Sequence, residues 1–80
     1  MKKVVSIIVN GQEKEWEKDE ISFKEVVILA FGSYDENPQI VYTVTYKRGQ
    51  GNKPEGTMVK GESVKVKDKM IFNATRTDRS

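Results

Sequence analysis

Residues 22–32 read SFKEVVILAFG, and this stretch decides how the rest of the chain can fold. Its apolar residues recur at helical spacing, which predicts a helix that buries one face. No other segment has this spacing, so one short helix must bury its apolar stripe against a sheet. Ile28 and Leu29 lie on the flanks, where we expect them to cover the ends of the sheet rather than be exposed for a partner. The stripe consists of Phe23, Val26, Val27, Ala30 and Phe31.

Both ends of this helix carry sequence signals. Ser22 and Glu25 are three residues apart, so each side chain can accept the backbone amide of the other in a capping box. Ile21 and Val26 are spaced as a hydrophobic staple, which sets the angle at which the chain enters the helix. Gly32 provides the left-handed residue that ends many helices. The helix is therefore predicted to begin after Ser22 and to end at Gly32.

Two strands joined by a tight turn are predicted before the helix. Residues 4–9 are a β-branched run that is typical of a strand with a buried face. Asn10-Gly11 predicts a type I′ hairpin turn, in which both central residues need positive φ. Residues 12–18 alternate charges around Trp16, as an edge strand does. Trp16 itself either packs this strand onto the helix, which we favour because apolar residues are more often inside, or contacts a partner from the surface.

The second half of the chain reads as strands and loops. The strand predicted at 39–47 has apolar residues at its even positions, and Val41, Thr43 and Thr45 at its odd ones. Residues 76–80 carry nothing apolar, so we expect a domain over residues 1–75 and a flexible tail over 76–80. The other segments are a polar loop at 33–38, a glycine-containing loop at 48–56, short extended pieces at 57–59 and 64–66, a turn at 67–69 and a last strand at 70–75.

Composition limits the classes of protein that remain. Eighty residues make one domain. The absence of cysteine and histidine excludes disulfides, the usual zinc sites, and thiolate or imidazole catalysis. The net charge of +2 is well short of a nucleic-acid footprint. The apolar run at 4–9 is too short for a signal peptide or a membrane span, so we expect a cytoplasmic protein without membrane contact.

Few residues offer chemistry, and we expect no catalytic residue, no cofactor and no metal. Ser63 reads as a turn serine rather than a nucleophile. Asp35 and Glu36 lack the spacing of a calcium loop and read as solvated turn acids. Residues 49–54, GQGNKP, begin like a dinucleotide fingerprint, but they follow a strand without opening a helix. A flexible connector is the better interpretation of this loop.

The order of elements predicts an α+β fold of the β-grasp type. Two strands, a helix and two or three further strands suit a mixed sheet of four to five strands that wraps one helix. A ferredoxin-like split arrangement is the main competitor, but it needs a second helix. None of the segments after Gly32 offers one.

Several segments in the same order carry a resemblance to a known family. They are residues 9–11 with 14–16, 25–27 with 30–31, 40–46, 53–57, 60–61 with 63–66, and 70–73. On these residues the chain resembles the bacterial multi-ubiquitin domain family, a set of ubiquitin-like proteins, from about Val4 to the end. One departure is Lys69, which stands where the family's glycine is expected.

The resemblance implies a β-grasp modifier. Such proteins are encoded beside ubiquitin-activating-like and conjugating-like enzymes and a processing metallopeptidase, in operons suspected of antiphage defence. The reactive group would then be a C-terminal carboxylate that a partner adenylates, and the chain itself would be a monomer. The implied partner surface, on the solvent side of the sheet, is Thr43, Thr45 and Lys47. The implied conjugation tail is Thr75, Arg76, Thr77, Asp78, Arg79 and Ser80.

The end of the chain departs from the ubiquitin pattern. Ubiquitin and the sulfur carriers end in two glycines, whereas this sequence ends in Asp78-Arg79-Ser80, which disfavours a sulfur carrier. For a modifier, a peptidase would trim the tail, the enzymes would accept a non-glycine end, or the natural chain would continue past Ser80. The alternative is a β-grasp module that binds another protein and is never conjugated. Nucleic-acid binding is a third hypothesis with weak support from charge alone, through Lys47, Arg48, Lys53, Arg76 and Arg79.

Overall fold

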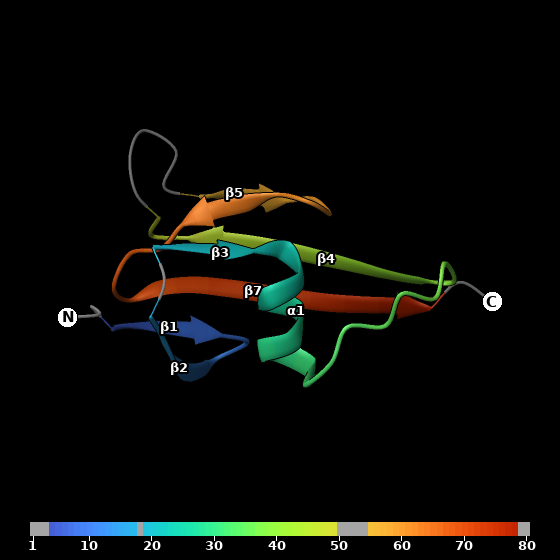
Figure 1. Cartoon of the computed structure of the whole chain (residues 1–80), viewed down its shortest axis with the longest axis horizontal. Helices are drawn as coiled ribbons and strands as arrows, with labels where there is room; N and C mark the ends of the chain where they lie inside the picture. The colour runs from blue at the N-terminus through green and yellow to red at the C-terminus, as the bar shows by residue number, and fades with distance from the viewer. Residues whose placement is uncertain (1–3, 18, 50–54, 79–80) are drawn as a thin grey trace.

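The computed structural model describes residues 4–17, 19–49 and 55–78. In these residues one helix lies across one face of a five-stranded sheet, and a second sheet of two short strands lies beside it (Figure 1). The prediction of an α+β β-grasp is confirmed. The elements are β1 (Val5–Val9), β2 (Gln12–Trp16), β3 (Glu20–Ser22), α1 (Phe23–Phe31), β4 (Ile40–Lys47), β5 (Gly56–Met58), β6 (Ser63–Lys65) and β7 (Met70–Asp78).

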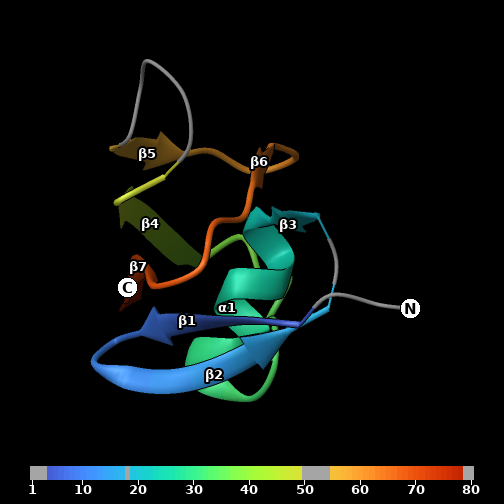
Figure 2. The ribbon, with the colours of Figure 1, turned by 90° about the vertical axis from the view of Figure 1, so that its left-hand side faces the viewer.

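The large sheet is mixed and has the strand order β2-β1-β7-β4-β5. β1 and β7 are parallel neighbours at its centre, whereas the other pairs are antiparallel. The hairpin between β1 and β2 turns at Asn10 and Gly11, with φ of 51° and 80°. Both angles are positive, as the type I′ prediction requires. Figure 2 shows the sheet wrapping around α1, with β4 and β5 on one side of the helix and β1 and β2 on another.

The helix begins and ends where the sequence predicts. The Glu25 amide donates to Ser22 Oγ at 3.1 Å, and the Ser22 amide donates to Glu25 Oε1 at 3.0 Å, so the capping box is complete. At the other end Gly32 has a φ of 86°, and its amide donates to the Ile28 carbonyl at 2.7 Å. These bonds satisfy backbone groups that a helix end otherwise leaves without partners.

The buried stripe of the helix is shorter than predicted. Phe23, Val26 and Val27 are buried, and Ala30 packs against the core from a partly buried position. Phe31 is 40% exposed, so its assignment to the buried stripe is wrong. It is the last helical residue, and no further turn follows to cover its ring. Its ring still contacts Tyr42, with the ring centroids 5.8 Å apart.

The core joins the helix to both halves of the sheet. Trp16 packs against it from the edge strand β2, and its Nε1 donates to the Glu20 carbonyl at 3.0 Å. The interpretation of Trp16 as a core-packing residue therefore holds. Leu29 is partly buried against the core, whereas Ile28 is 41% exposed. The buried residues are Ile7, Val9, Ile21, Phe23, Val26, Val27, Tyr42, Val44, Met58, Val66, Met70, Phe72 and Ala74.

The last strand is longer than predicted. We expected it to end at Thr75, but β7 continues to Asp78, so that boundary is wrong by three residues. Residues 75–78 lie opposite residues 40–43 of β4, and a ladder of backbone hydrogen bonds needs no apolar side chain. The expected division between domain and tail, after residue 75, therefore falls inside a strand. Residues 79–80 lie outside the described part of the chain.

Other boundaries moved by one or two residues, and one pairing was not expected. β2 ends at Trp16 rather than at residue 18, while β5 and β6 each begin one residue earlier than predicted. β3 was not expected at all. It pairs antiparallel with β6, so that Ile21 lies opposite Val64. This small sheet holds the start of α1, where the Phe23 amide donates to the Glu62 carbonyl at 2.9 Å.

The turn before β7 contains a residue with positive φ, a conformation that glycine adopts more easily than other residues. Lys69 has a φ of 70°, in the left-handed region that L-residues disfavour. Its amide donates to the Ser6 carbonyl at 2.6 Å, and the Ser6 amide donates to Asp68 Oδ1 at 2.9 Å. These two bonds fix the turn against β1. Lys69, where the family's glycine was expected, is thus accommodated in a left-handed conformation.

Within residues 4–17, 19–49 and 55–78, no helix has the length and apolar character needed to cross a bilayer.

Candidate functional site

The face of the large sheet that points away from α1 is rich in hydroxyl groups. Side chains alternate along a strand, and Tyr42 and Val44 of β4 are in the core, so the odd residues of β4 lie on the opposite side. Their neighbours follow from the strand register. We call this surface the open face, and its central residues are Val41, Thr43, Thr45 and Lys47 of β4, Thr57 of β5, and Ile71, Asn73, Thr75 and Thr77 of β7.

The predicted partner surface lies at the centre of the open face. Thr43 and Lys47 are exposed, and Thr45 is half-buried between Thr57 of β5 and Asn73 of β7. The three residues occupy alternate positions of β4, so their side chains lie in a row on the open face. Lys47 lies opposite Ile71, which provides an apolar neighbour for its stem.

Sequence reasoning missed the apolar part of this surface. Ile8 of β1 is the register partner of Ile71, and both are half-buried on the side away from α1. The alternation of β1 and β7 could have indicated this, since their neighbours Ile7 and Phe72 are fully buried. The pairing itself joins strands from opposite ends of the chain, and no local signal specifies it.

The predicted conjugation tail is part of β7 in the described residues. Thr75 and Thr77 are exposed on the open face, while Arg76 is on the helix side, opposite Tyr42. Arg76 Nη2 lies 3.9 Å from Asp35 Oδ2, and its Nε lies 3.5 Å from Asp78 Oδ1. These ion pairs are partly exposed and are therefore weak. Arg79 and Ser80 lie outside the described residues.

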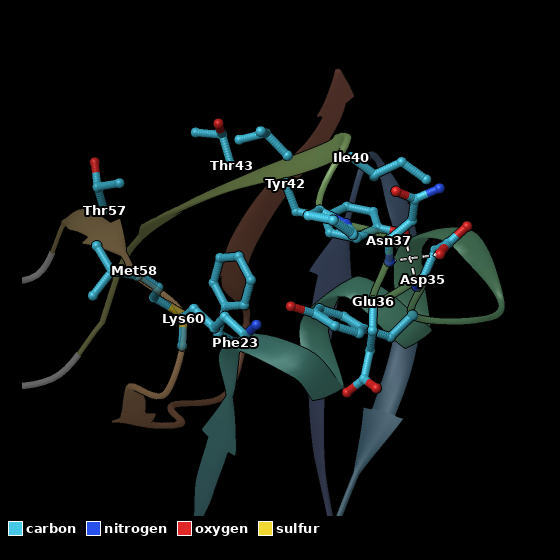
Figure 3. A pocket seen from close by; sticks show the side chains of 14 residues that line it. Phe23, Asp35, Glu36, Asn37, Ile40, Tyr42, Thr43, Thr57, Met58 and Lys60 are labelled. Atoms are coloured by element: carbon cyan, nitrogen blue, oxygen red, sulfur yellow. Dashed lines mark hydrogen bonds between the residues drawn. The ribbon is translucent and has the colours of Figure 1, made fainter. Parts of the chain in front are cut away.

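A groove lies along the edge of β4 that continues past β5, between the start of α1, the loop at 34–38, and β5 (Figure 3), and its lining includes Val41, Thr43 and Thr57 of the open face. Its volume is about 420 Å³, within the size range of ligand pockets. Hydrogen bonds fix the loop that forms one end: the Asp35 amide donates to Tyr42 Oη at 3.0 Å, and the Asn37 amide to Asp35 Oδ1 at 2.9 Å. The groove is lined by Phe23, Tyr34, Asp35, Glu36, Asn37, Pro38, Ile40, Val41, Tyr42, Thr43, Thr57, Met58, Val59 and Lys60.

The other candidate residues from the sequence do not come together in one site. In the described parts of the chain no group of three acidic side chains could hold a metal ion, and Asp35 is engaged by Arg76 and by the Asn37 amide. Ser63 is exposed in β6, opposite Ser22. Of the loop at 49–54, Gly49 alone is described.

The cations proposed for nucleic-acid binding are separated as well. Lys47 is at the C-terminal end of β4 on the open face, whereas Arg76 lies opposite Tyr42 on the helix side. Five residues of a strand span about 17 Å, so these two do not form one basic patch. Arg48 is exposed next to Lys47, while Lys53 and Arg79 lie outside the described residues.

A mixed sheet with a central parallel pair, an N-terminal hairpin and one helix across one face defines a ubiquitin-like β-grasp domain. The sequence model of the multiubiquitin family matches residues 5–78, and the chain belongs to that family. No curated protein and no solved structure matches it significantly.

Proposed function

We propose that this ubiquitin-like domain is a protein modifier, activated at its C-terminal carboxylate and joined to a target. Membership of the multiubiquitin family over residues 5–78 is the observation that carries the proposal. The partners are a ubiquitin-activating-like enzyme, a conjugating-like enzyme and a processing metallopeptidase. A role in bacterial antiphage defence, which the resemblance implies, and a cytoplasmic location are part of the same proposal.

In this role the chain is a substrate and not an enzyme. A free carboxylate does not acylate amines or hydroxyls, so the activating enzyme first joins it to the α-phosphate of ATP and releases pyrophosphate. A nucleophile on the enzyme or the target then attacks the acyl carbon, and AMP leaves with the bonding electrons. The position of β7 suits this chemistry, since the strand ends at Asp78, towards one end of the molecule's long axis (Figure 1).

The pairing of β7 places a condition on activation. Residues 76–78 are held against β4, with Asp78 opposite Ile40, and a segment in a sheet cannot thread into another active site. Either these residues leave β4 when the partner binds, or the reacting carboxylate lies on chain that follows Asp78. Trimming by the peptidase is compatible with the first route, and acceptance of a non-glycine end is compatible with the second.

The open face is the proposed contact surface for the activating enzyme. Thr43, Thr45 and Lys47 offer two hydroxyls and a cation, and Ile71 adds apolar area beside Lys47. Contact with the open face would leave the helix side of the sheet unoccupied. We propose a monomer as the form that is recognised.

The test is an ATP-dependent reaction of the purified domain with its cognate activating enzyme, followed by intact-mass measurement. The expected result is a covalent adduct that forms only with ATP. A matched protein with a C-terminal carboxamide keeps the fold and removes the reacting group, so it should form none. If the unmodified and the trimmed chains both fail to give an adenylate or an adduct, the modifier proposal is wrong.

A non-conjugated binding module is the second candidate function. The continuation of β7 to Asp78 favours it, since strand pairing restrains the segment that conjugation would need. Such a module would form a complex with its partner through the open face without ATP. Nucleic-acid binding would instead show a steep salt dependence. The separation of Lys47 from Arg76 argues against nucleic-acid binding.

A further inference from the structure

The first half of β4 has a strand neighbour on one side only. β7 pairs with the whole of β4, from Ile40 to Lys47, whereas β5 pairs only with Val44 to Tyr46. In the described residues no strand pairs with Ile40–Thr43 on the β5 side. A strand edge of this kind presents backbone donors and acceptors to an added strand.

The groove follows this same edge. Figure 3 shows Met58 and Lys60 at one end, Asp35 and Asn37 at the other, and β4 along the side. Its floor includes the buried Phe23, Tyr42 and Met58. Val59, beyond the end of β5, also lines it and is 57% exposed. A segment in the groove would therefore continue the line of β5 and rest on an apolar floor.

The two ends of the groove carry opposite charge. Lys60 is exposed at the β5 end, and Glu36 is exposed at the loop end, beside Asp35. β5 is antiparallel to β4, so a strand in the same direction would run from Thr43 towards Ile40. Its N-terminal end would face Lys60 and its C-terminal end would face Glu36. An acidic residue first and a basic residue last complement these charges.

We propose that the edge at Ile40–Thr43 and the adjoining groove bind a short extended peptide of a partner protein. The peptide adds antiparallel to β4 in line with β5, and alternate apolar side chains enter the groove. Its N-terminal end is acidic and its C-terminal end is basic. This site is at the edge of the sheet with its floor on the helix side, and its occupation does not depend on activation of the C-terminal carboxylate.

A second copy of the chain fits this edge poorly. Its β4 carries its own β5 on the same edge, next to Val44–Tyr46. Antiparallel pairing of the two edges would bring each β5 against the other copy's turn at Asn37–Ile40, where the Ile40 amide donates to the Asn37 carbonyl at 2.9 Å. A free peptide has no such obstacle.

The probe is a synthetic peptide in which valine and threonine alternate, with glutamate first and arginine last. A second peptide exchanges the two terminal residues, with arginine first and glutamate last. Each is titrated into the ¹⁵N-labelled protein. We expect the first peptide to shift the amide resonances of Ile40–Thr43 and of Met58–Lys60, and to slow hydrogen exchange along that edge. Each mismatched end should weaken the affinity of the second peptide about two- to fivefold.

Exchange of the charges at the two ends of the groove tests the direction in which the peptide binds. Glu36 and Lys60 are exposed, so Glu36→Lys and Lys60→Glu leave the core intact, and the double variant should reverse the preference between the two peptides. Glu13→Lys, on the distant edge strand β2, is the matched control and should leave it unchanged. The proposal is overturned if neither peptide binds, if the shifts fall on open-face residues away from this edge, such as Lys47, Asn73 and Thr75, if both peptides bind equally, or if sedimentation shows that the edge mediates a dimer instead.

Discussion

Thr43 of β4 lies directly opposite Thr75 of β7, and both are exposed on the open face. The centre of the proposed contact surface and the first residue of the proposed conjugation segment are thus cross-strand neighbours. An enzyme that bound the open face at Thr43 would also touch the start of that segment. In the proposed function, recognition of the domain and access to its C-terminal residues would therefore be linked through one pair of strands.

The orientation of the helix can be tested by two neighbouring substitutions. Val27 is fully buried, whereas Ile28 is 41% exposed. Val27→Asp buries a carboxylate without a partner and should lower the free energy of unfolding by several kcal/mol or prevent folding. Ile28→Asp should cost less than about 1 kcal/mol. Denaturant unfolding measures both, and equal effects would contradict the orientation of α1.

The capping box gives a second prediction. Ser22→Ala removes the Oγ that accepts the Glu25 amide, so the free energy of unfolding should fall by about 1 kcal/mol. Ser33→Ala, just after the helix in an exposed position, is the matched control. An unchanged unfolding midpoint for Ser22→Ala would show that the cap adds no stability.

The helix could be predicted from the sequence because its signals are local. The Ser22–Glu25 spacing, the apolar period and Gly32 all lie within eleven consecutive residues. The end of β7 and the β3–β6 pair could not, because they depend on strands distant in sequence. Thr77, for example, is in a strand because Val41 lies opposite it. The groove is a product of the same long-range pairing, since it exists where β5 stops short along β4.

The left-handed turn at Lys69 predicts a stabilising substitution. Lys69 has a φ of 70°, which a residue with a Cβ adopts at a cost of about 1–2 kcal/mol. Lys69→Gly removes this cost, and part of the gain is offset by the larger entropy of glycine in the unfolded chain. The net expectation is a rise of about 0.5–1 kcal/mol in the free energy of unfolding.

The control for this substitution is its neighbour at residue 67. Lys67 is not among the residues with positive φ, so Lys67→Gly should lower stability by a comparable amount. Thermal and denaturant unfolding of the two variants should move in opposite directions. A fall in stability for Lys69→Gly would mean that the side chain of Lys69 matters more than its backbone conformation.

Charge reversal at Lys47 tests whether the open face is the contact surface for the activating enzyme. Lys47 is exposed and lies opposite Ile71, so Lys47→Glu should preserve the fold while weakening binding to the cognate activating enzyme. Loss of one charge pair at an interface rim appears mainly in the association rate and in its salt dependence. Lys24→Glu, at an exposed position of α1, is the control of equal charge change. Unaltered binding by Lys47→Glu would exclude Lys47 from the contact.

The C-terminal segment gives the prediction on which the proposed function depends most. Removal of residues 76–80 takes away three strand pairs with β4, from Tyr42–Arg76 to Ile40–Asp78. Since a backbone hydrogen bond adds about 0.5–1.5 kcal/mol net, the shortened protein should remain folded but lose about 1–3 kcal/mol of stability. Arg76→Ala, which removes only the partly exposed ion pairs, should cost less than about 1 kcal/mol.

The same shortened protein separates the two candidate functions. For a modifier, deletion of residues 76–80 should abolish the ATP-dependent adduct, because the new carboxylate at Thr75 lies inside the β4–β7 pairing, opposite Thr43. Arg76→Ala should keep the adduct because the segment is still present. If the metallopeptidase trims the chain, the intact mass should fall by the residues removed, and only the trimmed form should react with ATP. If the untrimmed chain reacts directly, its own C-terminal residue supplies the acyl group. For a binding module, the shortened protein should still bind its partner through Thr43 and Lys47 without ATP. Complex formation that is retained, with no covalent adduct from the untrimmed, trimmed or shortened protein, would therefore support the binding module and contradict the modifier.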